Sequence, residues 1–162
     1  MTDLPPWEPP FAGTELEHLT GALDRLRWTF RWKADGLDAD QLAFRLPTSA
    51  LSIGSLLKHL AWVEDTKFTW VFSGTKPSLI DAIPEGVEPD AWAFTITADD
   101  TPSVLYDRFD ARVAQSRRLL AEAIADGGLD RPAHFVFGDI QPSLRRIVSD
   151  LIEEYGRHTG HA

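Results

Sequence analysis

The C-terminal segment of the chain carries an apolar stripe that changes into metal-ligand side chains. Ile147, Leu151, Glu154, His158 and His161 follow one another at spacings of four, three, four and three residues. This rhythm keeps all five side chains on one face of an α-helix, where a bundle normally buries leucine, isoleucine or valine. Burying carboxylate and imidazole groups without partners is costly, so the stripe requires a compensating ligand. A divalent metal ion is the simplest one, because Glu and His four residues apart can both reach a single ion.

Local signals predict three further helices of similar length. Thr14 opens a T-x-x-E capping box, Ser52 caps a second helix, and Thr101 precedes a proline suited to the first helical position. Each start is followed by leucine, isoleucine or phenylalanine at spacings typical of a helix that buries one face. With the C-terminal helix, these signals predict an all-α four-helix bundle without a sheet, its helices at 14–34, 52–73, 102–126 and 143–161.

The connections between these helices differ in length and composition. Residues 1–13 are rich in proline and lack periodicity, so we expect an extended N-terminal arm that Trp7 and Phe11 hold against the bundle. Residues 38–42 begin with a D-x-x-Q capping pattern, which predicts one short helical turn. Residues 74–100 contain several glycines and prolines and predict an irregular connection long enough to cross the bundle.

Length and composition limit the class of protein. At 162 residues with 43% apolar content, residues 1–162 are expected to form a single globular domain. The net charge of −9 argues against nucleic-acid binding. No apolar run approaches the ~20 residues needed to span a bilayer, and the first residues do not resemble a secretory signal, so we expect a cytoplasmic protein. The chain has no cysteine, which excludes thiolate metal ligands and a cysteine nucleophile.

One more histidine lies on the core face of a predicted helix. His59 has Leu56 three residues before it and Val63 four residues after it, so its side chain is directed toward the core. A single histidine in this setting is more often a hydrogen-bonded core residue than a ligand. Combined with Glu154 and His158, it predicts a mononuclear metal site with open coordination positions. A di-iron carboxylate site would need two Glu-x-x-His motifs, which the sequence lacks.

Four further side chains lie near this predicted site. His161, one turn beyond His158, is a less favoured candidate ligand. Asp150 and Glu64 each lie about one turn from a predicted ligand, where a carboxylate can orient an imidazole. Arg157 is a candidate contact for an anionic substrate, although ion pairing along the helix is the more common role. We therefore treat Glu64, Asp150 and Arg157 as candidate catalytic residues.

Three segments of the chain resemble the DinB-like (DinB/YfiT) superfamily, in particular its actinobacterial-type branch of single-domain proteins. They are KADGLDADQL, LSIGSLLKHLAWVEDTKF and SLRRIVSDLIEEYGRHTGH. The resemblance implies an up-down-down-up bundle, in which 74–100 is the long crossover between the second and third long helices. It also implies one divalent metal ion, commonly zinc or nickel, at the positions of His59, Glu154 and His158. Asp150 stands where relatives often have histidine.

The resemblance also implies a function. Family members include mycothiol-dependent maleylpyruvate isomerase and S-transferases that use mycothiol or bacillithiol. Our leading hypothesis is a metal-dependent thiol S-transferase. Its partners would be a small-molecule thiol, such as mycothiol as cosubstrate, and an electrophile. A homodimer is compatible with this function. Two alternatives stay open: a non-catalytic metal-binding stress or interaction protein, and a metal-dependent hydrolase with Glu64 or Asp150 as base.

Overall fold

Four long helices dominate the structure, a computed structural model that describes residue 5 and residues 7–162. The third of them, α5, spans Pro102–Ala125, and the last, α6, spans Leu144–His161. The first, α1, spans Glu15–Lys33, while α3, Ile53–Asp65, continues into a π-helix, η1, at Thr66–Phe72. These bounds agree with the predicted helices to within about two residues. None of the helices in the described ranges is both long enough and apolar enough to cross a membrane.

The predicted caps Thr14, Ser52 and Thr101 start three of these helices, and Ser143 caps the fourth. Thr14 accepts a hydrogen bond from the Glu17 backbone N–H, and the Glu17 carboxylate accepts one from the Thr14 backbone N–H, which completes the capping box. Ser52 and Ser143 cap α3 and α6 in the same way, each accepting from the backbone N–H three residues later. Because each cap satisfies donors that the first helical turn leaves unpaired, the helix starts are specified locally.

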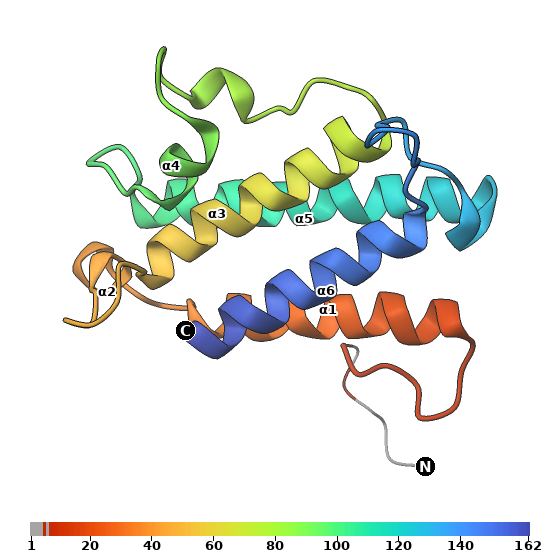
Figure 1. The fold of residues 1–162 in the computed structure, drawn as a ribbon. Helices are drawn as coiled ribbons and strands as arrows, with labels where there is room; N and C mark the ends of the chain where they lie inside the picture. The colour runs from red at the N-terminus through yellow and green to blue at the C-terminus, as the bar shows by residue number, and fades with distance from the viewer. Residues whose placement is uncertain (1–4, 6) are drawn as a thin grey trace.

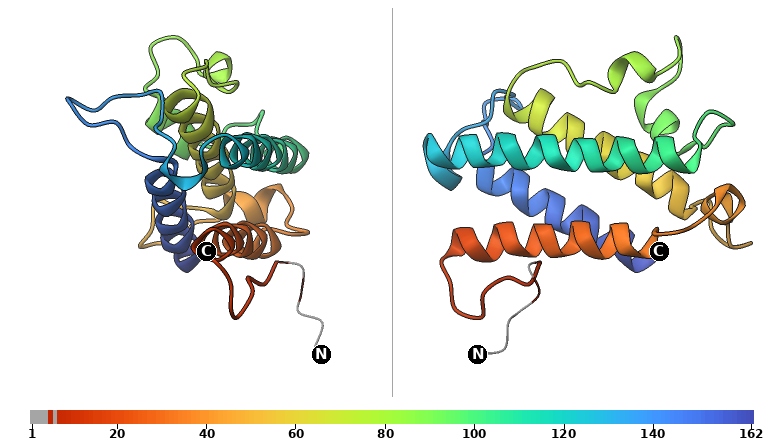
Figure 2. Two further views of the ribbon diagram at one scale, coloured as in Figure 1. Left: turned by 90° about the vertical axis from the view of Figure 1, so that its right-hand side faces the viewer. Right: turned by 180° about the vertical axis from the view of Figure 1, so that it is seen from behind.

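The four helices form two parallel pairs. Followed by colour in Figures 1 and 2, α1 and α6 run in one direction, and α3 and α5 run in the other. Residues 74–100 carry the chain from the end of η1 back to the start of α5, so they are the predicted crossover. The topology is therefore up-down-down-up, as the sequence resemblance implies.

The core is the space that these four helices enclose. Leucine and phenylalanine side chains fill it, and the stripe on α6 contributes Ile147 and Leu151, both at most 1% exposed. A buried polar cluster crosses this core. Arg27 of α1 donates two hydrogen bonds of 2.7 Å to the carboxylate of Glu64 on α3, and the Tyr155 hydroxyl of α6 donates a third of 2.9 Å. The cluster thus joins three of the four long helices.

The connections between the long helices contain short helices, one of which the sequence predicts. The predicted turn after α1 forms as α2, Ala39–Ala43, with its capping box. The crossover contains a 3₁₀ turn, η2, at Ile80–Ala82 and a short helix, α4, at Pro89–Phe94, which packs on α3. Pro89 occupies the first turn of α4, a position that proline favours. Within residues 7–162 there is no β-strand, only two isolated bridges between residues of the loop before α6.

The prediction for the N-terminal arm is half correct. Residues 1–4 and 6 lie outside the described residues, so that part of the arm is not tested. Trp7 stacks on Trp28 of α1 with ring centroids 3.8 Å apart, as expected of a residue that holds the arm in place. Phe11 was the wrong choice for the second contact, because 85% of its surface is exposed.

Candidate metal centre

Two long helices bring the three predicted ligands together. His59 lies in the middle of α3, and Glu154 and His158 lie one turn apart on α6. One ligand atom from each residue lies within 4.8 Å of the other two. The two imidazole Nε2 atoms approach the same Glu154 oxygen, Oε1, at 2.8 Å from His59 and 2.9 Å from His158.

The arrangement fits a divalent ion. Zinc binds imidazole nitrogen and carboxylate oxygen at about 2.0–2.2 Å, so a small outward movement of the three groups would admit an ion between them. The Nδ1 atoms of His59 and His158 are buried and have no hydrogen-bond partner among the described residues. In the present geometry each Nε2 donates to the Glu154 carboxylate, so binding an ion through Nε2 would shift that proton to Nδ1. Two nitrogens and one oxygen would leave coordination positions for substrate.

The charges of the group also suit a cation. Burial acts to raise the pKa of Glu154, but hydrogen bonds from His59 and His158 outweigh it and lower that pKa overall. Burial, and secondly the neighbouring His59, lowers the pKa of His158. At neutral pH the group is thus a carboxylate with a neutral His158 imidazole, the protonation state that metal binding requires.

Aromatic packing covers one side of the group. The ring of Phe94 stacks on the His59 imidazole with centroids 4.0 Å apart, and the two imidazoles lie edge to face at 4.9 Å. Phe94 is the last residue of α4, a helix that the sequence analysis missed. The signal available for it was Pro89 at a helix start followed by the apolar run A-W-A-F. Phe94 therefore shields the centre from the crossover side.

Arg157 and His161 lie next to the three-residue group. Arg157 donates a 2.7 Å hydrogen bond to Oε2 of Glu154, the oxygen that does not face the imidazoles, and a 2.8 Å hydrogen bond to Glu153. It therefore holds the Glu154 carboxylate in its present orientation. The His161 ring lies 5.6 Å from the His158 ring but is not part of the converging group.

The structure does not bring Glu64 or Asp150 into the group. Glu64 is fully buried, and both of its carboxylate oxygens accept hydrogen bonds from Arg27, one of them also from Tyr155. Asp150 pairs with Arg146 at 2.6 Å and with Lys67 at 3.3 Å. Sequence reasoning missed Arg27, although it stands on the apolar stripe of α1, four residues after a buried leucine and three before a buried phenylalanine.

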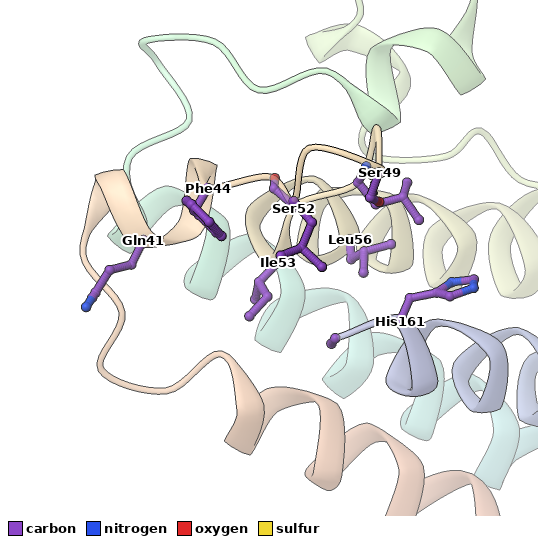
Figure 3. Close-up of a pocket in the computed structure, with 10 residues that line it drawn as sticks. Gln41, Phe44, Ser49, Ser52, Ile53, Leu56 and His161 are labelled. Atoms are coloured by element: carbon purple, nitrogen blue, oxygen red, sulfur yellow. Dashed lines mark hydrogen bonds between the residues drawn. The ribbon is translucent and has the colours of Figure 1, made fainter.

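Two hollows flank the centre. A cavity of about 220 Å³ lies between α2, the start of α3 and the end of α6, and His161 lines it together with Leu56 and Ile53 (Figure 3). On the other side, a hollow of about 340 Å³ includes Glu154 itself, which is 22% exposed. This second hollow, here named the polar hollow, has mostly charged walls: Lys67, Arg146, Asp150, Glu153, Glu154 and Arg157. Of these two hollows, only the polar hollow is lined by one of the three ligand candidates, Glu154.

Topology and site together define a DinB-like helical bundle with a two-histidine, one-glutamate group between its second and last long helices. A family model described as mycothiol S-transferase matches residues 18–162. The chain therefore belongs to the mycothiol S-transferase family. It is also similar in fold to a solved structure of a conserved protein from Enterococcus faecalis, with a TM-score of 0.67 and 17% identity over 92% of this chain and 93% of that one. No curated protein matches the chain.

Proposed function

We propose that this protein is a metal-dependent S-transferase that conjugates mycothiol to an electrophile. The observation that carries the proposal is the convergence of His59, Glu154 and His158 within 4.8 Å in a chain of this family. These three residues would hold one divalent ion, zinc or nickel. When bound, such an ion supplies Lewis acidity that lowers the pKa of a coordinated thiol. We also place the protein in the cytoplasm.

The thiol must come from outside the chain, because the sequence has no cysteine. The polar hollow is where we place it. At about 340 Å³ this hollow lies within the usual range of small-molecule sites, and its charged walls offer donors and acceptors to the hydroxyl groups of a sugar-like thiol. In the reaction, the thiol sulfur forms a bond to the electrophilic carbon, the leaving group departs with its bonding electrons, and the thiol proton passes to solvent.

Two neighbouring residues support the reaction without taking part in it. Phe94 covers the His59 ring and keeps water from that side of the centre, which strengthens electrostatic interactions within it. Arg157 fixes the Glu154 carboxylate through its outer oxygen. We do not assign Glu64 the role of a catalytic base, since its carboxylate is fully engaged in the buried cluster with Arg27. This disfavours the hydrolase alternative in which Glu64 activates water.

A thiol-consumption assay on metal-loaded protein tests the proposal. Purified protein is analysed for metal, then supplied with mycothiol and either monobromobimane or chlorodinitrobenzene. We expect product formation above the uncatalysed rate, its loss on chelation and its return on adding zinc or nickel. If a fully loaded protein gives only background rates with mycothiol, bacillithiol and glutathione, the transferase proposal fails and a non-catalytic metal-binding role replaces it.

A further inference from the structure

An apolar pocket of about 500 Å³ continues the polar hollow along α6. Its apolar walls come from three elements: Val71 of η1, Phe137 and Ile140 of the loop before α6, and Ile147 of α6. Lys67, Arg146 and Asp150 line both the apolar pocket and the polar hollow. The two spaces are therefore neighbours along α6, with Glu154 lining the first and Ile147 the second, and together they are here named the groove.

Backbone hydrogen bonds build the outer wall of the apolar pocket. The loop between α5 and α6 folds over the end of η1 (Figure 1), where the backbone N–H groups of His134 and Phe135 donate to the carbonyls of Phe72 and Val71 at 2.8 and 3.0 Å. Phe137 and Ile140 then exchange two backbone hydrogen bonds of 2.8 and 3.0 Å around a tight turn. Gly138 supplies the positive φ of +61° that this turn requires. The wall is thus positioned by the fold.

The side chains that flank this turn are large, apolar and exposed. The turn itself carries the small polar residues usual there, Gly138 and Asp139, whereas Phe137 is 58% exposed and Ile140 is 73% exposed. Both line a pocket in which Ile147 is buried. Large apolar groups held open to water around a concave surface are typical of a binding site for an apolar ligand.

Charges at the middle of the groove are paired with one another. Asp150 accepts from Arg146 at 2.6 Å and from Lys67 at 3.3 Å. Two cations share this one carboxylate, so the middle of the groove keeps a net positive charge. This charge disfavours a cationic ligand there.

We propose that the apolar pocket binds the apolar tail of the electrophilic cosubstrate, an elongated molecule whose reactive end lies beside the thiol in the polar hollow. The inference rests on the proposed function, since the reactive carbon must lie at the metal centre. From Glu154 to Ile147 the groove covers seven residues of helix, or roughly 10 Å. We therefore expect a tail about that long, with its end between Phe137 and Ile140. An α,β-unsaturated aldehyde with a medium-length alkyl chain represents the class.

The reaction of such a compound balances without a redox partner. The thiol sulfur bonds to the β-carbon, and the electrons of the carbon–carbon π bond move to the α-carbon. The α-carbon then takes up a proton from solvent, which replaces the proton lost by the thiol. Nothing is oxidised or reduced.

Binding of unreactive alcohols tests the groove separately from catalysis. Dissociation constants for straight-chain alcohols from butanol to decanol are measured on metal-loaded protein by calorimetry or ligand-observed NMR. We expect affinity to rise by up to about fourfold for each methylene that leaves water, until the pocket is filled. The double variant Phe137→Ser/Ile140→Ser should lose this dependence on chain length. Phe11→Ser, a change at another exposed aromatic side chain, should keep it.

A matching series of α,β-unsaturated aldehydes of increasing chain length connects binding to turnover. With mycothiol present, KM should fall from acrolein to decenal in the wild type and in Phe11→Ser, and should vary little with length in the double variant. Alcohol binding that is independent of chain length, or insensitive to the double variant, overturns the inference even if acrolein is conjugated. Background rates with acrolein, monobromobimane and chlorodinitrobenzene at full metal loading instead refute the proposed function.

A self-association surface is the competing explanation for Phe137 and Ile140. Sedimentation of the wild type and of the double variant separates the two. If the double variant converts a dimer into a monomer while decanol binding is unchanged, the two side chains belong to a dimer interface and the inference is wrong. An unchanged oligomeric state with lost decanol binding supports it.

Discussion

Replacing Glu64 by glutamine takes from a buried arginine its only buried counter-charge among the described residues and leaves it the part-exposed Asp24, 3.0 Å away. Arg27 is 2% exposed and Glu64 is fully buried, and two hydrogen bonds of 2.7 Å join them. Removing one partner of a buried, hydrogen-bonded ion pair costs about 3–5 kcal/mol, because the remaining charge stays away from water. A domain of this kind has a free energy of unfolding of about 5–15 kcal/mol, so Glu64→Gln should remove a large share of it.

Urea unfolding followed by circular dichroism measures this loss. With an m-value of about 2 kcal/mol/M, the midpoint should fall by roughly 2 M. Chelator is present throughout, so that metal binding to the folded state does not contribute to the stability. Glu153→Gln is the matched control, since Glu153 also pairs with an arginine but is 72% exposed, and its loss should stay below about 1 kcal/mol.

A second variant separates loss of charge balance from loss of packing. Arg27→Met/Glu64→Leu removes both charges and should recover most of the stability that Glu64→Gln loses, because well-packed apolar residues can replace a buried ion pair at little cost. Tyr155 would then lack its acceptor, which limits the recovery. A Glu64→Gln protein within about 1 kcal/mol of the wild type would refute the view that this cluster clamps three helices together.

Four further predictions concern the candidate metal centre and the surface charge. Elemental analysis of His158→Ala should find no stoichiometric metal. In the wild type the pKa of His158 lies below its ordinary value of 6.5, so zinc should stay bound as the pH falls to 6.5 and should be released only below pH 6.5. Zinc release well above pH 6.5 would contradict this. Arg157→Ala should weaken zinc affinity about tenfold in a chelator competition, because Glu154 loses its orienting partner. Arg117 is as exposed as Arg157, so Arg117→Ala is the control and should leave zinc affinity unchanged. With a net charge of −9, the protein should show no salt-sensitive binding to random duplex DNA at physiological salt.

The four long helices were predictable because their signals are local. Capping residues such as Thr14 and Ser52 act within one turn, and an apolar stripe acts within one helix. The shared face of Glu154 and His158 was predictable for the same reason, since they are four residues apart on one helix. Local signals do not show which helices meet, so the pairing of His59 with them rested on its place on a core face and on a family resemblance.

What the sequence did not predict depends on tertiary packing. Helix α4 has six residues, too few for a periodic pattern, and it is held by contacts with α3. Phe94 gains its place over His59 from that packing alone. The placement of Glu64 likewise depended on Arg27, whose partner is 37 residues away. Each miss involved a contact between elements whose relative position the sequence pattern does not encode.

The two helices that carry the candidate metal centre are far apart in the chain, so an ion bound there would be linked to the stability of the fold. His59 and Glu154 are 95 residues apart, so an ion held by both would close a loop longer than half of the chain. In an unfolded chain, the length-dependent entropy of closing such a loop costs on the order of 4 kcal/mol. The folded bundle has already brought the two ends together, so an ion there would act as a reversible cross-link. Its dissociation constant would then measure how firmly the last helix is docked.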